Sequence, residues 1–173
     1  MRQLDTKRLI LRQVTHDDVQ AIFDNWASDP EVTKYLTWNA HENISVTHQI
    51  MDFWLDEYKK DNCYRYGIER KSDGELMGMI DVVGYHHGNP VIGYCSGRKY
   101  WNNGYMSEAL EALIKELFSN GYNTIVAEAA KENTGSNRVI QKAGFKLAAS
   151  REAAISEIKP EIVTINSYRL NKA

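Results

Sequence analysis

The passage from Val91 to Ala130 constrains the fold more than any other part of the chain. A segment rich in strand-forming residues, VIGYC, leads through a polar turn into a long segment with helical spacing. A second strand-like segment, TIVAEAA (124–130), follows it. Two strands that are joined through a helix run parallel in one sheet. We therefore expect one local parallel strand pair.

The connecting segment carries a strong helical pattern. Its apolar residues recur at helical spacing, namely at Met106, Leu110, Leu113, Ile114, Leu117 and Phe118. Asn120 and Gly121 supply a C-terminal stop. A shorter helix is expected over SNRVIQKAG, where Gly144 stands at the end.

The segment before this passage predicts an antiparallel meander. Tyr64, Tyr66 and Ile68 alternate, as in a strand that is buried on one face. Turn residues at 72–74 and 86–90 separate this strand from strands at 76–83 and 91–95. The sheet is therefore expected to be mainly antiparallel.

The remaining segments complete a mixed α/β fold. We expect a first strand at 8–14, a helix over 15–30 and a second helix over 44–60, which places Ile50, Trp54 and Tyr58 on one face. Two last strands, near 153–158 and 162–170, flank Pro160. The prediction is a twisted, mostly antiparallel sheet with a parallel pair and about four helices. With 173 residues and no repeat or linker, residues 1–173 are expected to form a single domain.

Composition excludes several classes of protein. The net charge is −2, whereas a general nucleic-acid-binding protein is usually basic. Cys63 and Cys95 are too few for a disulfide framework and are expected to be reduced thiols in the cytoplasm. No His or Cys spacing resembles a metal site. The N-terminal apolar run is too short for a signal peptide or a membrane span.

The turn that opens the helix, RKYWNNG (98–104), has the properties of an anion site. A helix N-terminus offers unpaired N–H groups and partial positive charge, which suit a phosphate or pyrophosphate. Asn102, Asn103 and Gly104 tolerate unusual backbone angles, and Arg98 and Lys99 add charge. The alternative is a capped surface turn with solvated cations.

Two motifs resemble the GNAT superfamily of acyl-CoA-dependent N-acetyltransferases, in particular its RimJ/RimL-type group. The first is KYWNNG followed by YMSEA (99–109), and the second is NTGS followed by KAGF (133–145). The opening segment, 6–36, is also similar, and the resemblance weakens after Ser150. Lys99 stands where Gln or Arg is usual, and Asn102 stands where the first Gly is usual.

The resemblance implies a binding mode for acetyl-CoA. Backbone N–H groups of the turn and the first helical turn would hold the pyrophosphate, and the pantetheine arm would lie between two splayed parallel strands. The implied cofactor-binding residues are Tyr94, Cys95, Arg98, Lys99, Asn102, Asn103, Gly104, Tyr105, Met106, Ser107, Asn133, Ser136 and Asn137. For the two asparagines and the serine of the second motif, helix capping is the alternative role.

The implied reaction is direct transfer of an acetyl group to a primary amine, with no metal. Ser136 is the first candidate for the acid that protonates the leaving thiolate, and a tyrosine such as Tyr94 is the second. A backbone N–H near Tyr94 or Cys95 would stabilise the oxyanion. Candidate bases are Asp81, Glu108 and Glu128, each with a structural ion pair as the alternative. A covalent role for Cys95 is disfavoured because no neighbouring base is evident.

The sequence does not identify the amine that accepts the acetyl group. Trp38, Trp54 and Tyr58 fall in the region that shapes the acceptor pocket in relatives, although core packing also explains Trp54. A protein N-terminus, an aminoglycoside, a polyamine and an amino-acid-like metabolite all remain. The sequence also leaves the oligomeric state open, between a monomer and a homodimer. A non-catalytic acyl-CoA sensor is the main alternative function, and a P-loop protein is disfavoured because its Gly/Lys motif is absent.

Overall fold

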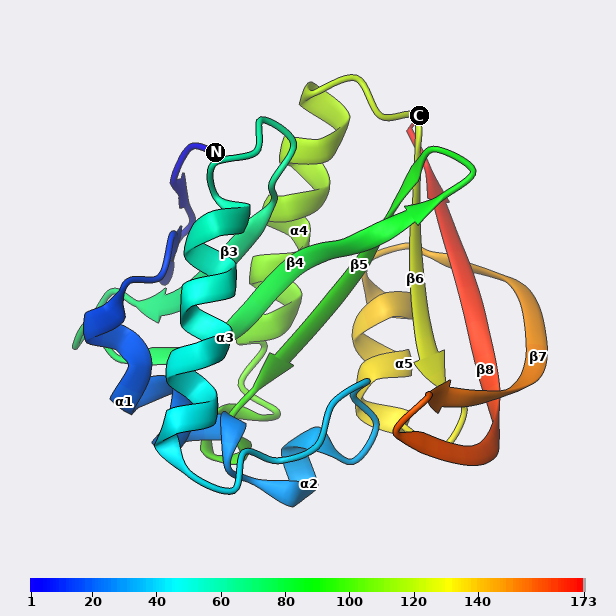
Figure 1. The fold of residues 1–173 in the computed structure, drawn as a ribbon. Coiled ribbons are helices and arrows are strands. Elements are labelled where there is room, and N and C mark those ends of the chain that lie inside the picture. Colours follow the sequence, from blue (N-terminus) through cyan, green and yellow to red (C-terminus); the bar gives the residue numbers. More distant parts are fainter. Residues whose placement is uncertain (173) are drawn as a thin grey trace.

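A computed structural model describes residues 1–172 and shows one eight-stranded sheet, in the order β1-β2-β3-β4-β5-β6-β8-β7 (Figure 1). The strands are β1 (Leu4–Asp5), β2 (Leu9–Arg12), β3 (Arg65–Arg70), β4 (Leu76–His86), β5 (Asn89–Ser96), β6 (Thr124–Ala130), β7 (Lys146–Ser156) and β8 (Lys159–Asn171). All neighbouring strands are antiparallel except β5 and β6, which run parallel. The predicted parallel pair in a mainly antiparallel sheet is confirmed.

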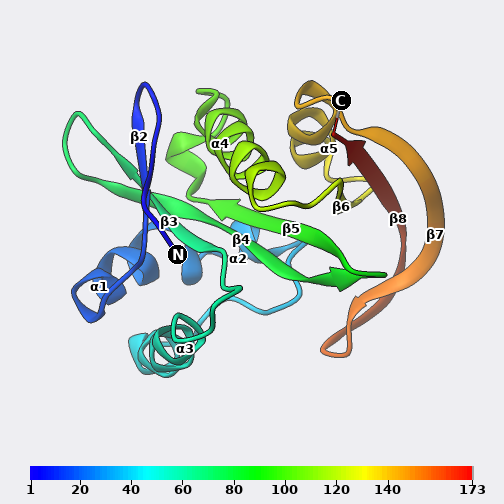
Figure 2. The same cartoon turned by 90° about the horizontal axis from the view of Figure 1, so that it is seen from above.

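Helices cover both faces of this sheet. They are α1 (Val19–Ile22), α2 (Pro30–Thr33), α3 (Ile44–Glu57), α4 (Tyr105–Ser119) and α5 (Thr134–Lys142). Figure 2 shows α4 and α5 on one face and α1, α2 and α3 on the other. Each face has its own apolar cluster, with Leu110 and Leu113 of α4 buried on one face and with Trp26 and Met51 buried on the α3 side. The mixed α/β architecture predicted from the sequence is therefore confirmed.

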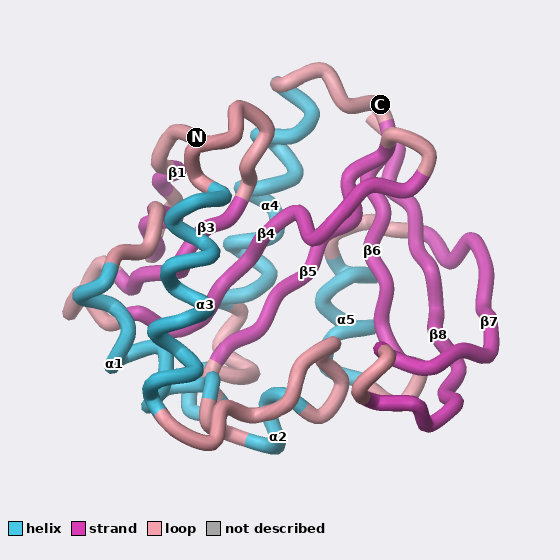
Figure 3. Tube along the Cα trace, viewed as in Figure 1, coloured by secondary structure: helices cyan, strands magenta, loops and turns pink. Residues whose placement is uncertain are grey.

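The parallel pair is short, and its strands then diverge. β5 pairs with β6 only at Val91–Val126 and Ile92–Ala127. Beyond these pairs, β5 remains bonded to β4 as far as Ser96, and β6 remains bonded to β8 as far as Ala130. The two strands separate along their length in Figure 3. The facing edges of Gly93–Ser96 and Glu128–Ala130 therefore make no ladder with each other.

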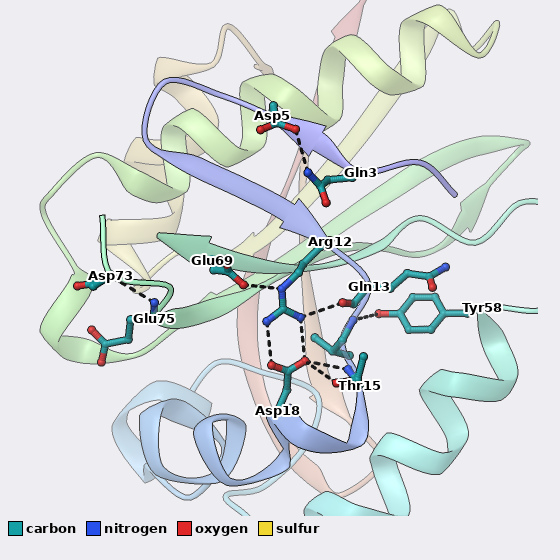
Figure 4. Close-up of polar contacts among 11 residues, drawn as sticks. Gln3, Asp5, Arg12, Gln13, Thr15, Asp18, Tyr58, Glu69, Asp73 and Glu75 are labelled. Carbon is teal, nitrogen blue, oxygen red and sulfur yellow. Dashed lines mark hydrogen bonds and ion pairs between the residues drawn. The ribbon is translucent and has the colours of Figure 1, made fainter. Parts of the chain in front are cut away.

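An arginine network fixes the α1 and α3 side of the sheet (Figure 4). Arg12 on β2 donates from Nε to Glu69 at 2.5 Å, and from Nη1 and Nη2 to Asp18 at 2.8 and 2.9 Å. The hydroxyl of Tyr58, just after α3, accepts from the backbone N–H of Val14 at 3.1 Å. These contacts join β2 and β3 to the first helical turn and to the end of α3. They hold both helices against the sheet.

The expected helix over 15–30 is divided. A 3-10 turn (His16–Asp18), α1 and a π-helical turn (Phe23–Ala27) follow one another. Pro30 does not end this helix but begins α2, where Asp29 accepts from the N–H of Glu31 as the N-cap. Proline is well suited to the first helical position, because its missing N–H would have no partner there.

The last two strands are longer than expected. β7 begins at Lys146, seven residues before the predicted start at 153, and Pro160 lies inside β8. β7 is the edge strand, and most of its side chains are exposed. An edge strand exposed on both faces needs no alternation of apolar residues, so the usual signal was missing. At Pro160, β8 has only β7 as a neighbour because its pairing with β6 begins at Ile165, so this part of the strand has a free edge where proline is tolerated.

Lys159 fastens the β7–β8 hairpin to the segment that follows α2. Its Nζ donates to the carbonyls of Thr33 and Leu36 at 2.5 and 2.8 Å. Lys159→Met is expected to lower the free energy of unfolding by about 1–2 kcal/mol, because two carbonyls lose a charged donor. Urea unfolding measures this, with Lys115→Met on exposed α4 surface as the control. Equal midpoints for the two variants would contradict the expectation.

Candidate functional site

The turn before α4 adopts the strained backbone that its composition indicated. Asn102 has a φ of 61° and Gly104, the N-cap of α4, has a φ of 74°. The first intrahelical bond runs from the N–H of Glu108 to the carbonyl of Gly104 at 3.2 Å. The N–H groups of Tyr105, Met106 and Ser107 therefore have no partner within the helix. This turn can present several N–H groups to one anion.

A cation that sequence reasoning missed lies at this turn. Arg8, just before β2, donates from Nη1 to the carbonyl of Asn103 at 3.0 Å, and its guanidinium lies 4.5 Å from the ring centre of Tyr105. Its Nε also donates to Glu108 at 2.7 Å, and the Thr6 hydroxyl donates to the same carboxylate at 2.6 Å. Although burial opposes it, these hydrogen bonds lower the pKa of Glu108. Glu108, a candidate base, is thus engaged in holding the turn.

The two cations within the turn are already paired. Arg98 Nε donates to Asp29 at 2.6 Å, and Lys99 Nζ donates to Glu75 at 2.5 Å. Both side chains are more than half exposed, at 58% and 56%. Contact with a phosphate would therefore compete with these ion pairs, and Arg8 is the cation that touches the turn's backbone.

Tyr94 and Ser136, the two candidate acids, meet beside the point where β5 and β6 separate. The Tyr94 hydroxyl donates to the carbonyl of Ser136 at 3.1 Å and lies 2.9 Å from its Oγ. Burial raises the pKa of Tyr94 to about 12, so the phenol is protonated at neutral pH. With its own hydrogen directed at the carbonyl, Tyr94 can accept the hydrogen of the Ser136 hydroxyl. Residues 42 positions apart thus form one hydroxyl pair.

The two asparagines of the second motif differ in how they are used. Asn133 accepts from the N–H of Ser136 at 3.2 Å as the N-cap of α5, and its amide nitrogen donates no hydrogen bond within residues 1–172. Asn137 is buried and donates to the carbonyls of Ala130 and Asn133 at 2.8 and 2.7 Å, while it accepts from Tyr168 at 2.6 Å. Asn137 therefore joins β6, α5 and β8. The expected contact between its side chain and a cofactor finds no support in this placement.

Asp81 lies on the opposite face of the sheet, beside β5. It is paired in register with Arg65 on β3 and with Gly93 on β5, and Arg65 Nε donates to it at 3.0 Å. A Cβ placed on Gly93 would lie 2.5 Å from a methyl carbon of Val83 and 3.5 Å from the Asp81 carboxylate, so the glycine makes room for the Val83 side chain beside Asp81. Burial raises the pKa of Asp81, although Arg65 opposes the shift. The Nη1 of Arg65 is buried and has no hydrogen-bond partner within residues 1–172.

Glu128 occupies the other side of the gap. The register pairs Ile92 with Ala127, which places Glu128 at the level of Gly93 and Asp81. Its carboxylate accepts two bonds from Arg151, at 2.7 and 2.9 Å, and these bonds lower its pKa. Two carboxylates therefore lie at one level on the strands that flank β5, Asp81 with a raised pKa and Glu128 with a lowered pKa.

The remaining predicted residues lie on the α3 face of the sheet, the face that Asp81 also occupies. Burial raises the pKa of the Cys95 thiol to about 12, which leaves it a neutral and poor nucleophile. Trp38, Trp54 and Tyr58 all pack against the apolar cluster between the sheet and α3. The Trp54 ring centre lies 5.5 Å from the guanidinium carbon of Arg65, so it borders the Arg65–Asp81 pair.

Comparison with known proteins gives a consistent family assignment. Residues 8–146 match the family model "Acetyltransferase (GNAT) domain". An uncharacterized N-acetyltransferase of Bacillus subtilis (strain 168), YoaA, is 36% identical over 149 residues, covering 83% of this chain and 82% of that protein. The chain therefore belongs to the GNAT acetyltransferases and is an acetyltransferase.

Solved structures share the whole fold. A GNAT-family acetyltransferase from Bacillus anthracis has a TM-score of 0.85 at 24% identity, covering 98% of each chain. RimL, a ribosomal L7/L12 alpha-N-protein acetyltransferase solved with coenzyme A, has a TM-score of 0.84 at 18% identity, again covering 98% of each chain. The predicted resemblance to the GNAT superfamily is thus confirmed, and the fold is shared with RimL.

Residues 1–172 contain neither a metal-binding cluster nor a membrane-spanning helix. This part of the chain contains no group of three or more His, Cys, Asp or Glu side chains arranged to hold a metal ion. Its helices are too short or too polar to span a bilayer.

Proposed function

We propose that the protein transfers an acetyl group from acetyl-CoA directly to a primary amine. The observation that carries the proposal is the gap between β5 and β6, which opens beside the left-handed turn at Asn102–Gly104. The unpaired N–H groups after Gly104 suit the pyrophosphate, and the free edge of Gly93–Ser96 suits the amide groups of the pantetheine arm. The fold shared with RimL, which was solved with coenzyme A, supports this placement.

Within this proposal, Asp81 is the general base. A carboxylate works best as a base when its pKa is raised toward the working pH, and burial shifts Asp81 in that direction. Glu108 and Glu128 have lowered pKa values and are engaged by Arg8 and Arg151. Asp81 would take the proton of the attacking amine, directly or through one water.

The amine nitrogen then bonds to the thioester carbon, the carbon–sulfur bond breaks, and the departing thiolate takes up a proton. The Tyr94–Ser136 pair is the donor in this proposal, because both hydroxyls lie at the edge of the gap and share hydrogen bonds. A backbone N–H near Tyr94 or Cys95 would stabilise the oxyanion before the bond breaks. Trp38 and Trp54 would border the acceptor on the α3 side.

Ser136→Ala and Tyr94→Phe are each expected to lower kcat by about 10²-fold, with acetyl-CoA affinity kept within a few-fold. The double variant should be no slower than the slower single variant, because the two hydroxyls act as one unit. Steady-state kinetics and calorimetry give the two constants. If both single variants keep kcat within about twofold, the proton comes from water. If affinity falls and kcat holds, the pair only contacts the cofactor.

The proposed activity is tested by incubating the protein with acetyl-CoA and a panel of amines while coenzyme A release is followed. The panel contains unblocked peptides, their N-acetylated counterparts, polyamines, aminoglycosides and amino acids. We expect release with at least one free amine and none with its blocked form. Tight acetyl-CoA binding without release on any amine would instead support the acyl-CoA sensor.

A further inference from the structure

A groove of about 680 Å³ lies on the concave face of the sheet. Its residues come from all five strands from β4 to β8, and Val83, Val91 and Ala149 give it an apolar lining. Figure 2 shows the β7–β8 hairpin curving toward the α3 side, where it forms one wall. Val83 is 60% exposed although it is apolar. Because its lining crosses five adjacent strands, an extended peptide can lie across it.

The charges in this groove are biased toward positive. Its one acidic lining residue, Glu128, is held by two hydrogen bonds from Arg151. Arg169 and His86 also line the groove, and Arg169 makes no ion pair or hydrogen bond within residues 1–172. The chain as a whole has a net charge of −2, so this local excess of cations runs against the general composition.

Sheet register gives the distance from Arg169 to the gap. Arg169 on β8 pairs with Val126 on β6, and Val126 pairs with Val91 on β5. Gly93 lies two residues further along β5. With strand spacings of about 4.8 Å and a rise of about 3.3 Å per residue, the Cα atoms of Gly93 and Arg169 lie roughly 12 Å apart on a flat sheet. An extended peptide spans this distance with three to four residues.

We propose that this groove binds a peptide acceptor through an acidic side chain within its first four residues. The inference rests on the proposed N-acetyltransferase function, in which Asp81, the register partner of Gly93, takes the proton of the reacting amine. Arg169 then pairs with the acidic side chain, while the apolar lining contacts the intervening residues. Arg169 is thus a specificity-determining residue that binds the acceptor away from the reacting atoms.

The test measures binding separately from turnover. Fluorescently labelled peptides with Asp at position 2, 3 or 4, and their Asn counterparts, are titrated into protein saturated with coenzyme A at low salt. We expect the best Asp peptide to bind about 10-fold more tightly than its Asn counterpart, with the difference shrinking as salt is added. Arg169→Gln should abolish the difference, and Lys115→Gln, an equal charge change on exposed α4 surface, should preserve it.

Charge reversal provides a second measurement. Arg169→Glu should reverse the preference, so that a Lys peptide binds more tightly than the Asp peptide. Equal binding of Asp and Asn peptides by the parent protein, or a preference that survives in Arg169→Gln, would overturn the inference. Competition by inorganic phosphate at the same concentration as the Asp peptide would also overturn it, in favour of a simple anion site. If Asp and Asn peptides bind equally and neutral peptides are still acetylated, the proposed activity stands and only this inference is removed.

Discussion

Asp81→Asn is expected to lower kcat by about 10²–10⁴-fold while the KM for acetyl-CoA stays within a few-fold. The amide keeps the size of the carboxylate but cannot accept the proton of the attacking amine. Asp81 faces Gly93 at the start of the gap, and burial shifts its pKa upward, so it combines position with basicity. Steady-state kinetics with a working acceptor measure the effect, and circular dichroism checks that the variant is folded.

The pH dependence gives an independent readout. Because the base must be ionised and burial raises its pKa, kcat/KM of the parent should fall as the pH drops through a value above the ordinary carboxyl range of about 4. The residual activity of Asp81→Asn should lack this acidic limb. Glu128→Gln removes the other candidate base on this face, and this variant should keep the acidic limb of the pH profile. If Glu128→Gln loses the acidic limb and Asp81→Asn keeps it, Glu128 and not Asp81 is the general base.

Gly104→Val is expected to weaken acetyl-CoA binding by about 100-fold or more. Gly104 has a φ of 74°, a conformation that a β-branched side chain adopts only with strain. In the proposed binding mode, the valine would also stand where the pyrophosphate approaches the N–H groups at the start of α4. Losing two charge-assisted hydrogen bonds, at about 1.5–3 kcal/mol each, accounts for the size of the effect. Isothermal titration calorimetry measures it directly.

Gly121→Val is the matched control for backbone strain. Gly121 follows the other end of α4 with a φ of 92°, and no heavy atom lies within 4 Å of an added Cβ. Both variants should lose stability through strain, yet only Gly104→Val should lose cofactor binding. A folded Gly104→Val variant whose dissociation constant stays within about threefold of the parent would remove the turn from the proposed site.

Local patterns predicted the elements that carry the site. Helical spacing located α4, and the strand–helix–strand order predicted the parallel pair of β5 and β6, both of which the structure contains. The Asn and Gly residues of the turn indicated left-handed backbone, which Asn102 and Gly104 adopt. These features depend on backbone preferences over a few neighbouring residues, so they can be read from the sequence. The edge strand β7 was placed too late because its exposed residues have no apolar pattern.

The sequence by itself thus determined the mixed α/β class, the parallel pair, the turn and the resemblance to GNAT acetyltransferases. Only the tertiary structure decided how the polar side chains are used. Arg8 meets Glu108 across 100 residues, and Tyr94 meets Ser136 across 42. Strand register places Asp81 and Glu128 at one level, on the two strands that flank β5. Such contacts follow from how distant segments pack together, and no local spacing in the chain encodes them.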